Sequence, residues 1–365
     1  MEKLVMFGHA YHGRKVLITG HTGFKGSWLA YWLQLLGAEV SGISLPSETS
    51  PNHWGMLNLD MASFYIDIRD EHLIHQKIAE IKPEIVFHLA AQPLVRRSYQ
   101  QPLATWATNV MGTANVLDAC RQLESLSAIV VVTTDKCYEN NEWVWGYRET
   151  DHLGGHDPYS ASKAGSELVA RSYRKAFFNN PSSPLLATAR AGNVIGGGDW
   201  SEDRLIPDLV RALAIGQALE IRSPKSTRPW QHVLECLSGY LVLGQQLLSG
   251  NTACAEAWNF GPEREGNRQV QHVLAALQSS WPSVTWHCCD TPQPHEAQLL
   301  HLDSSKARDT LQWRPVWTFE EGIAETAAWY KAWLEDNAIM TGSQLERYYQ
   351  KAQEKQLCWA GEALL

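Results

Sequence analysis

The stretch KVLITGHTGFKGSW, residues 15–28, decides the fold. Its first five residues read as a buried strand, and Gly20, Gly23 and Gly26 follow in a GxxGxxG spacing before a helical pattern begins. In such a unit one glycine permits the tight turn, one lets backbone N–H groups approach a pyrophosphate, and one lets the helix pack close to the strand. The helix N-terminus then faces the phosphates. The stretch therefore predicts a dinucleotide-binding unit.

Outward from this unit, short apolar runs alternate with longer amphipathic stretches through the first half of the chain. This alternation predicts a parallel sheet with helices on both faces, a Rossmann-type doubly wound α/β fold. The expected strands cover residues 15–19, 39–44, 63–66, 85–89, 128–133 and 185–190. The expected helices cover residues 27–36, 70–80, 105–123 and 160–178.

After about residue 190 the regular alternation of strand-like and helix-like segments ends. A glycine-rich loop opens at Gly196, and Pro, Trp and His become frequent. We therefore expect a dinucleotide-binding domain over residues 1–190 and a smaller, mixed α/β domain over 191–365, interleaved with the first. A helix is predicted over 319–336, and the polar last ~25 residues form a frayed or a docking helix.

Composition excludes several classes of protein. The net charge of −8 is spread without a basic stripe, which argues against nucleic-acid binding. Seven cysteines form no CxxC pair, so reduced thiols and a cytoplasmic location are expected. Cys288 and Cys289 are neighbours, but no second pair at zinc-ligand spacing accompanies them, and no metal is expected. No signal-peptide core and no run of ~20 apolar residues is present, so no membrane association is expected.

The end of the second predicted strand bears on the choice of dinucleotide. Ser44 to Ser47 stand where an acidic residue would bind the ribose hydroxyls, and no Arg is placed there to hold a 2′-phosphate. This favours NAD weakly. Asp67 and Ile68, after the third strand, are candidates for the adenine edge, although Asp67 could instead cap the helix that starts near residue 70.

A phenol and an ammonium follow at helical spacing. Tyr159 and Lys163 are four residues apart and share one helix face, and Asp157-Pro158 marks the helix start. A nearby cation stabilises a phenolate, which can then take a proton from a sugar hydroxyl while hydride leaves for a nicotinamide. The alternative reading is a solvated helical turn. The glycine motif upstream favours the catalytic reading.

The sequence TTDK, residues 133–136, ends another predicted strand. Its side chains should lie at the carboxyl edge of the sheet, where ligands of open α/β sheets bind. Asp135 supplies an acid there, as loss of a sugar hydroxyl would require. The plain alternative is an Asx-type turn that leaves the strand.

With these motifs the chain resembles the extended short-chain dehydrogenase/reductases, in the NAD-dependent epimerase/dehydratase family, and among them the CDP-glucose 4,6-dehydratases. Three features make the resemblance to this last group more specific than to the superfamily: Lys25, the Asp135-Lys136 pair and the stretch GNVIGGGDW. The matching stretches are 20–28 (GHTGFKGSW), 88–96 (HLAAQPLVR), 109–113 (NVMGT), 135–138 (DKCY), 145–149 (WGYRE), 157–163 (DPYSASK), 190–200 (RAGNVIGGGDW), 228–233 (RPWQHV) and 258–262 (WNFGP).

The resemblance implies a hydro-lyase mechanism with NAD as cofactor. Tyr159, assisted by Lys163 and Thr134, deprotonates the C4 hydroxyl while hydride leaves C4. The new ketone acidifies C5, a base removes that proton, and Asp135 protonates the departing C6 hydroxyl before hydride returns to C6. Relatives acting on dTDP-glucose carry Glu after the Asp, whereas this chain has Lys136, so Lys136, Glu139 or a water molecule could be the C5 base.

The resemblance also implies a set of binding residues. For the cofactor these are Gly20, Thr22, Gly23, Phe24, Lys25, Gly26, Asp67, Ile68, Leu89, Ala90, Ala91, Thr108, Tyr159 and Lys163. For the CDP-glucose they are Gln92, Asn193, Arg204, Leu205, Arg228, His295 and Glu296. Arg204 and Arg228 suit phosphates, and Trp200 or Trp230 could stack on the ligand. Most of the sixteen tryptophans and His232 are expected to be structural.

Two further expectations come from the resemblance. Residues 105–123 and 160–178 would pair two subunits through a four-helix bundle, giving a homodimer and possibly a tetramer. The product would enter deoxysugar biosynthesis for the lipopolysaccharide O-antigen. The competing hypotheses are another nucleotide-sugar dehydratase, an epimerase or reductase on the same scaffold, and a non-enzymatic NAD-binding regulator, which the Tyr/Lys pair disfavours. The nucleotide preference rests on resemblance alone.

Overall fold

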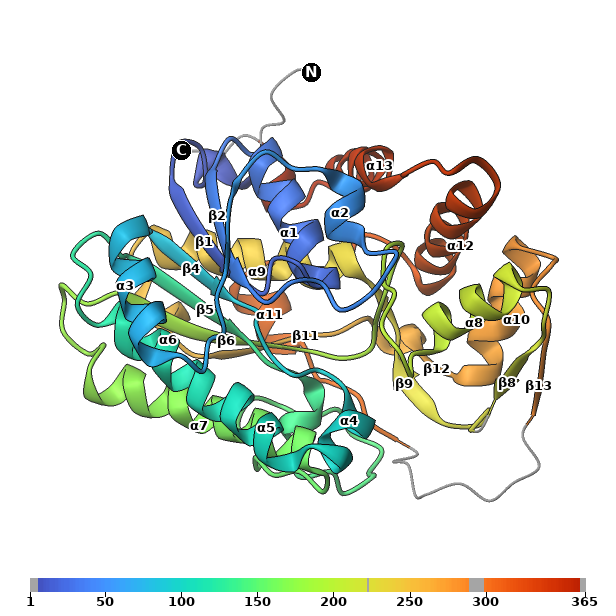
Figure 1. Ribbon diagram of the computed structural model, residues 1–365, viewed down its shortest axis with the longest axis horizontal. Coiled ribbons are helices and arrows are strands. Elements are labelled where there is room, and N and C mark those ends of the chain that lie inside the picture. The colour runs from blue at the N-terminus through green and yellow to red at the C-terminus, as the bar shows by residue number, and fades with distance from the viewer. Residues whose placement is uncertain (1–5, 222, 289–298, 362–365) are drawn as a thin grey trace.

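A seven-stranded parallel sheet forms the centre of the molecule (Figure 1). The structure is a computed structural model that describes residues 6–221, 223–288 and 299–361. The strand order is β11-β6-β5-β4-β1-β2-β3, so the order reverses between β1 and β4, which is where open α/β sheets bind ligands. The strands are β1 (Lys15–Thr19), β2 (Glu39–Ser44), β3 (Ala62–Tyr65), β4 (Ile85–His88), β5 (Ala128–Val132), β6 (Leu185–Ala191) and β11 (Ala257–Phe260).

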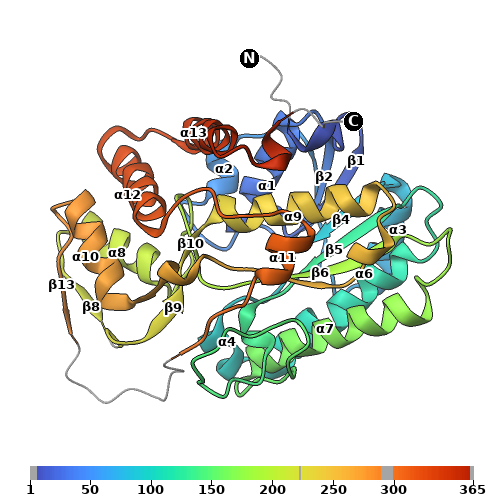
Figure 2. The ribbon, with the colours of Figure 1, turned by 180° about the vertical axis from the view of Figure 1, so that it is seen from behind.

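Helices cover both faces of this sheet, as the sequence predicts. One face carries α1 (Phe24–Leu35) and α9 (Val233–Leu248), and the other carries α3 (Glu71–Ile81), α6 (Gly112–Cys120) and α7 (Pro158–Ala176) (Figures 1 and 2). In β5, Val130 packs into the core on the α9 face, whereas Ile129 and Val131 pack into the core on the α7 face. Burial on both sides explains why the strands read as unbroken apolar runs.

Two elements differ from the sequence prediction. The helix predicted over 105–123 is divided into α5 (Pro102–Trp106), a π-helical segment η2 (Ala107–Met111) and α6. Within this region the Asn109 carbonyl also accepts a hydrogen bond from Thr113 Oγ1 (2.6 Å), a contact that helix propensity does not encode. The seventh strand, β11, was not predicted; it lies outside the strand–helix alternation of the first half and is defined by its parallel pairing with β6.

The second half of the chain builds a smaller group of elements beside the sheet (Figure 1). Its helices are α8 (Leu205–Ala214), α10 (Val270–Ser280) and α12 (Phe319–Asp336). Its strands pair as β8 (Leu219–Ile221) with β13 (Trp286–Cys288), β9 (Thr227–Pro229) with β12 (Asn267–Gln269), and β7 (Val194–Ile195) with β10 (Gln231–His232). However, α9 and β11 return to the central sheet, so the two halves interleave.

The C-terminal segment docks rather than frays. Helix α13 (Thr341–Glu354) buries Leu345, Tyr348 and Ala352, and Trp359 of the following 3-10 turn stacks on Phe7 with ring centroids 5.1 Å apart. Helix α13 and this turn therefore close over the same face of the sheet as α1 (Figure 2). The remaining short elements are η1 (Phe7–His9), α2 (His53–Leu57), α4 (Val95–Gln100), η3 (Asp135–Cys137), η4 (Thr252–Cys254), η5 (Arg264–Gly266), α11 (Ser305–Thr310) and η6 (Cys358–Ala360).

Among the helices of the described residues, none combines the length and apolarity that crossing a membrane would need.

Candidate active site

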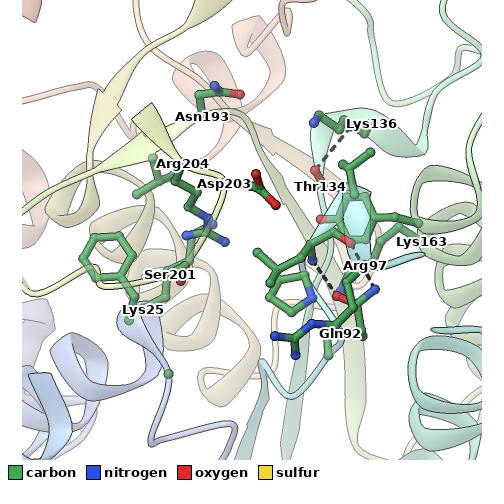
Figure 3. Close-up of a pocket in the computed structure, with 18 of the residues that line it drawn as sticks. Lys25, Gln92, Arg97, Thr134, Lys136, Lys163, Asn193, Ser201, Asp203 and Arg204 are labelled. Carbon is green, nitrogen blue, oxygen red and sulfur yellow. Dashed lines mark hydrogen bonds between the residues drawn. The ribbon is translucent and has the colours of Figure 1, made fainter. Parts of the chain in front are cut away.

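A cleft of about 2100 Å³ opens at the carboxyl edge of the sheet, between the sheet and the smaller group of elements. Figure 3 shows Arg204 and Asn193 across this cleft from Thr134, Lys136 and Lys163. His295 and Glu296 lie outside the described residues. All the other predicted site residues line the cleft: Gly20, Thr22, Gly23, Phe24, Lys25, Gly26, Asp67, Ile68, Leu89, Ala90, Ala91, Gln92, Thr108, Thr134, Asp135, Lys136, Tyr159, Lys163, Asn193, Arg204, Leu205 and Arg228.

The glycine-rich turn has the geometry that a pyrophosphate needs. Gly20 has φ +81°, and a Cβ there would come within 2.7 Å of the Ala90 nitrogen. A Cβ on Gly26 would come within 2.1 Å of the Gly20 carbonyl oxygen, so this glycine permits α1 to pack against the turn. Gly23 is open by comparison, and as the N-cap of α1 it gives no side-chain cap. The first-turn N–H groups are therefore available to an anion.

The far end of the cleft from Lys163 carries the residues predicted for adenosine. Asp67 pairs with Arg69 (2.5 Å), and this hydrogen bond lowers the pKa of the Asp67 carboxyl. The N-cap of α3 is Asp70, whose Oδ1 accepts from the Leu73 N–H (3.0 Å). The alternative reading of Asp67 as this cap is therefore wrong, and Asp67 is left facing the cleft.

Helix α7 presents Tyr159 and Lys163. The helix starts as predicted, because Asp157 Oδ1 accepts from the Ser160 N–H (2.9 Å) and Pro158 occupies the first turn. Burial raises the pKa of Tyr159 to about 12, against a hydrogen bond with Thr134 and the charge of Arg204. Burial and the charge of Lys25 lower the pKa of Lys163 to about 8. Lys163 Nζ donates to the Val132 carbonyl (3.3 Å).

Asp135 occupies a buried turn at the end of β5. Thr134 caps this turn by accepting from the Lys136 N–H (3.3 Å), so Asp135 is not needed as an Asx-type cap. Thr134 Oγ1 donates to Asp135 Oδ1 (3.0 Å), while Oδ2 has no hydrogen-bond partner among the described residues. The side chain is 1% exposed, and burial raises its pKa against the charges of Lys136, Arg228 and Lys25. Such a carboxyl can hold a proton and donate it.

The predicted substrate residues are held in different ways. Arg204 forms an ion pair with Asp199 (2.9 Å), and Arg228 is buried beneath the cleft wall. Gln92 uses its side chain to close its own loop, accepting from the Leu94 N–H (2.6 Å) and donating to Thr105 Oγ1 (3.0 Å).

The aromatic residues are mainly structural, as expected. Trp200 packs edge-on against Tyr330, and Trp230 donates to the Arg268 carbonyl (2.9 Å). Both also line the cleft, so stacking of either ring on the ligand stays a prediction. His232 accepts from the Leu234 N–H (3.3 Å) and caps α9. Five tryptophans are fully buried away from the cleft: Trp28, Trp32, Trp258, Trp313 and Trp329.

Sequence reasoning missed a set of charges at the cleft mouth. Arg97, on α4, bridges Glu48 (2.5 Å) and Glu202 (2.8 Å), and the neighbouring Arg96 pairs with Asp203 (2.8 Å). The pairs with Glu202 and Asp203 join α4 to the second half of the chain. The partners in these three pairs are about 50 and more than 100 residues apart, so no local spacing points to them. Among the described residues, no group of three or more His, Cys, Asp or Glu side chains could hold a metal ion.

A doubly wound sheet, a glycine-rich turn and a Tyr/Lys pair at its carboxyl edge define an enzyme of the extended short-chain dehydrogenase/reductase class. Within this class the chain belongs to a family described as GDP-mannose 4,6 dehydratase, whose model matches residues 17–326.

Comparison with known proteins places the chain among nucleotide-sugar dehydratases. It is 47% identical to a CDP-glucose 4,6-dehydratase of Salmonella typhimurium over 93% of this chain and 97% of that protein. It is 28% identical to a dTDP-glucose 4,6-dehydratase of Xanthomonas campestris, over 91% and 97% of the two chains. A dTDP-glucose 4,6-dehydratase from Streptomyces venezuelae, solved with NAD bound, superposes with a TM-score of 0.73 and 26% identity, covering 87% and 96% of the two chains.

Proposed function

We propose that this chain is an NAD-dependent CDP-glucose 4,6-dehydratase, which converts CDP-D-glucose to CDP-4-keto-6-deoxy-D-glucose with loss of water. The observation that carries the proposal is Asp135, a buried carboxyl with a raised pKa and one unpaired oxygen, in the same cleft as Tyr159 and Lys163. An epimerase or reductase needs the Tyr/Lys pair, but its reaction expels no hydroxyl from the sugar and so does not need this acid. The 47% identical relative named for this reaction supports the substrate assignment.

The cleft residues have defined roles in this reaction. NAD, when bound, accepts hydride from C4 and returns it at C6. Tyr159 accepts the proton of the C4 hydroxyl, and the Thr134 hydrogen bond and the charge of Arg204 favour its ionised form against burial. Lys163 lies one turn further along the same helix. Loss of the C5 proton to a base then expels the C6 hydroxyl, which leaves as water as Asp135 donates its proton. A proton returns to C5 when hydride is delivered to C6. The geometry of the glycine turn supports NAD at the N-terminus of α1.

The base at C5 stays a prediction. Lys136 follows Asp135 directly and is half-buried, whereas Glu139 is exposed at the rim of the same cleft. Because Lys136 is next to the proposed proton donor in the sequence, we favour Lys136 over Glu139 as the C5 base. Exchange of the C5 hydrogen with deuterated solvent should be lost in Lys136→Met and kept in Glu139→Gln.

The two ligands are proposed to bind to successive parts of the chain. Residues 1–190 would bind NAD and residues 191–365 the nucleotide sugar, with Arg204, Leu205 and Arg228 beside the diphosphate and nucleoside. This is supported by the position of Arg204 opposite the catalytic residues (Figure 3). The predicted roles of His295 and Glu296 remain predictions.

A homodimer is also proposed. Large apolar side chains are exposed along α5, η2 and α7, where a four-helix bundle would form: Leu103 (83% exposed), Met111 (57%) and Leu168 (54%). Leu103→Glu with Met111→Glu should reduce the dimer to monomer in analytical ultracentrifugation. We further propose a cytoplasmic enzyme whose product enters deoxysugar synthesis for the lipopolysaccharide O-antigen.

The decisive experiment compares four substrates. The purified chain with NAD is incubated with CDP-, UDP-, dTDP- and GDP-glucose, and the 4-keto-6-deoxy product is read by its absorbance in alkali. CDP-glucose should be turned over fastest. Equal turnover of dTDP-glucose would overturn the CDP assignment, and no product from any of the four would overturn the dehydratase.

A further inference from the structure

A buried ion pair lies directly beneath the proposed catalytic residues. Glu167, on α7, and Arg190, on β6, are each 3% exposed and are joined by a 2.7 Å contact between Arg190 Nη2 and Glu167 Oε2. The remaining hydrogen bonds of Glu167 come from two strands: Thr133 Oγ1 donates to Oε1 (2.5 Å) and Thr188 Oγ1 donates to Oε2 (2.8 Å). The carboxylate therefore ties α7 to the carboxyl ends of β5 and β6.

The arginine extends this connection beyond the catalytic turn. Arg190 Nη1 donates to the Tyr138 hydroxyl (2.7 Å), which in turn donates to Asn259 Oδ1 (2.8 Å). Tyr138 is 1% exposed and its ring lies under the guanidinium, 4.9 Å from it. Thr133, immediately before Thr134, and Tyr138, two residues after Lys136, are thus both anchored to one ion pair.

Stability alone does not account for such a pair. Burying two charges costs more hydration free energy than their attraction returns unless the geometry is good, and apolar side chains of similar volume often serve equally well. What apolar packing cannot supply is a fixed direction for each hydrogen bond. Here two bonds of the pair end on Thr133 and Tyr138, on either side of the segment that carries Thr134 and Asp135. The other bonds end on Thr188 of β6 and on the Glu149 carbonyl.

We propose that the Glu167–Arg190 pair positions the reaction: it fixes the turn that orients Asp135, and the Glu167 carboxylate stabilises the Lys163 ammonium one helical turn away. This inference rests on the proposed function. Neither side chain lines the cleft, so the two act through Thr133, Tyr138 and Lys163.

The charges around Lys163 support its part in the proposal. Burial and Lys25 of α1 lower the pKa of Lys163, whereas Glu167 and, to a smaller extent, Cys137 of η3 raise it. The buried His88 of β4, whose pKa is lowered to about 3, adds no positive charge at working pH. Glu167 is therefore the main group that keeps Lys163 protonated.

Tyr138→Phe tests the positioning of Asp135. It removes one hydroxyl, and with it the link from Arg190 to Asn259, while the ring stays. Because misplacement of a reacting group by about 1 Å can cost roughly a hundredfold, elimination should slow by roughly tenfold to a hundredfold while C4 oxidation continues, so NADH absorbance should accumulate on the enzyme. Tyr11→Phe is the matched control, since it deletes a buried hydroxyl that donates to the Leu241 carbonyl on the other face of the sheet.

Glu167→Gln tests the support of Lys163. The alkaline limb of the kcat–pH profile should move to lower pH, because the neutral amide no longer opposes burial and Lys25. Thr188→Val, which removes one donor to Glu167 and leaves its charge, should keep the wild-type limb. A fold that is merely loosened would lower kcat without moving the limb.

The outcomes separate the two proposals. If the wild type yields no 4-keto-6-deoxy sugar, the proposed function fails. If the wild type is active but Tyr138→Phe accumulates no more NADH than Tyr11→Phe, or the alkaline limb of Glu167→Gln is unchanged, the positioning role is overturned. Should Glu167→Gln fail to fold, the NADH signal of Tyr138→Phe still decides the proposal.

Discussion

Two buried carboxylates, one beneath the cleft and one beneath the C-terminal helix, are hydrogen-bonded to the same extent but differ in charge environment. Glu167 accepts three hydrogen bonds, one of them from Arg190. Glu235, on α9, also accepts three, from the Val316 and Trp317 N–H groups (both 2.8 Å) and the Tyr348 hydroxyl (2.9 Å). The pKa of Glu167 is lowered despite burial, whereas burial raises that of Glu235 to about 7.

The difference teaches what a cation contributes. Three neutral donors do not offset the loss of hydration of a buried carboxylate, but a guanidinium within hydrogen-bond distance does. The region beneath the cleft thus keeps a fixed charge over the working pH range, and the C-terminal region titrates near neutrality. Burial raises the pKa of Asp135 as it raises that of Glu235, against the charges of Lys136, Arg228 and Lys25.

The largest expected effect comes from removing the acid of Asp135. In Asp135→Asn the amide cannot protonate the C6 hydroxyl, so dehydration should fall by roughly 10²–10⁴-fold, the usual contribution of a general acid. Oxidation at C4 should persist, because Tyr159 and Lys163 are unchanged, and NADH should accumulate. Stopped-flow absorbance of NADH with product analysis would measure both steps; an unchanged dehydration rate would refute the assignment of Asp135.

The next largest effect is expected on stability, when the cation beneath the cleft, Arg190, is removed. Arg190→Met leaves Glu167 buried without its counter-charge, and breaking such a pair typically costs about 3–5 kcal/mol of unfolding free energy. The double variant Glu167→Gln/Arg190→Met removes the orphaned charge and should recover part of that loss. Urea unfolding of the three proteins measures this. A cost in Arg190→Met no larger than that in the double variant would contradict the comparison.

The features that the sequence predicts are those with local spacing. The glycine turn, the Tyr159–Lys163 pair and the strand end at Asp135 each lie within a few residues, because turn and helix geometry fixes their separation. The Glu167–Arg190 pair, 23 residues apart, and the Tyr348–Glu235 contact, 113 residues apart, depend on which strands and helices become neighbours. Only the spacing of Glu167, one helical turn after Lys163, hints at a shared role.

The missed elements have a similar cause. Strand β11 is recognisable only once β6 is in place to pair with it, and the π-helical segment depends on tertiary contacts of Asn109, whose side chain donates to Ser162 Oγ (2.8 Å) on α7. Helix propensity reports neither. The tertiary fold, rather than the local pattern, sets both features.

A third prediction concerns Glu235, which forms no ion pair with another of the described residues. Since the folded pKa of Glu235 is about 7, above the value near 4.3 of an unfolded glutamate, its stabilising contribution is full at low pH and is lost as pH rises through 7. Glu235→Gln has no such titration. The unfolding free energy of the wild type minus that of Glu235→Gln should therefore fall by on the order of 1–3 kcal/mol between about pH 5 and about pH 8.

Urea unfolding at the two pH values measures that difference, and the other carboxyls are common to both proteins. A difference that stays constant, or that grows with pH, would show that Glu235 is not protonated preferentially in the folded state. The conclusion that the C-terminal region titrates near neutrality would then be wrong.

The smallest expected change in unfolding free energy comes from a solvent-exposed ion pair. Glu80, 60% exposed at its side chain, pairs with Lys77 (2.5 Å) on α3, far from the cleft residues. Water and salt screen such a pair, so Glu80→Gln should change the unfolding free energy by less than about 1 kcal/mol, with the change vanishing in high salt. A cost approaching that of Arg190→Met would mean that the charge itself, and not its removal from water, makes the Glu167–Arg190 pair strong.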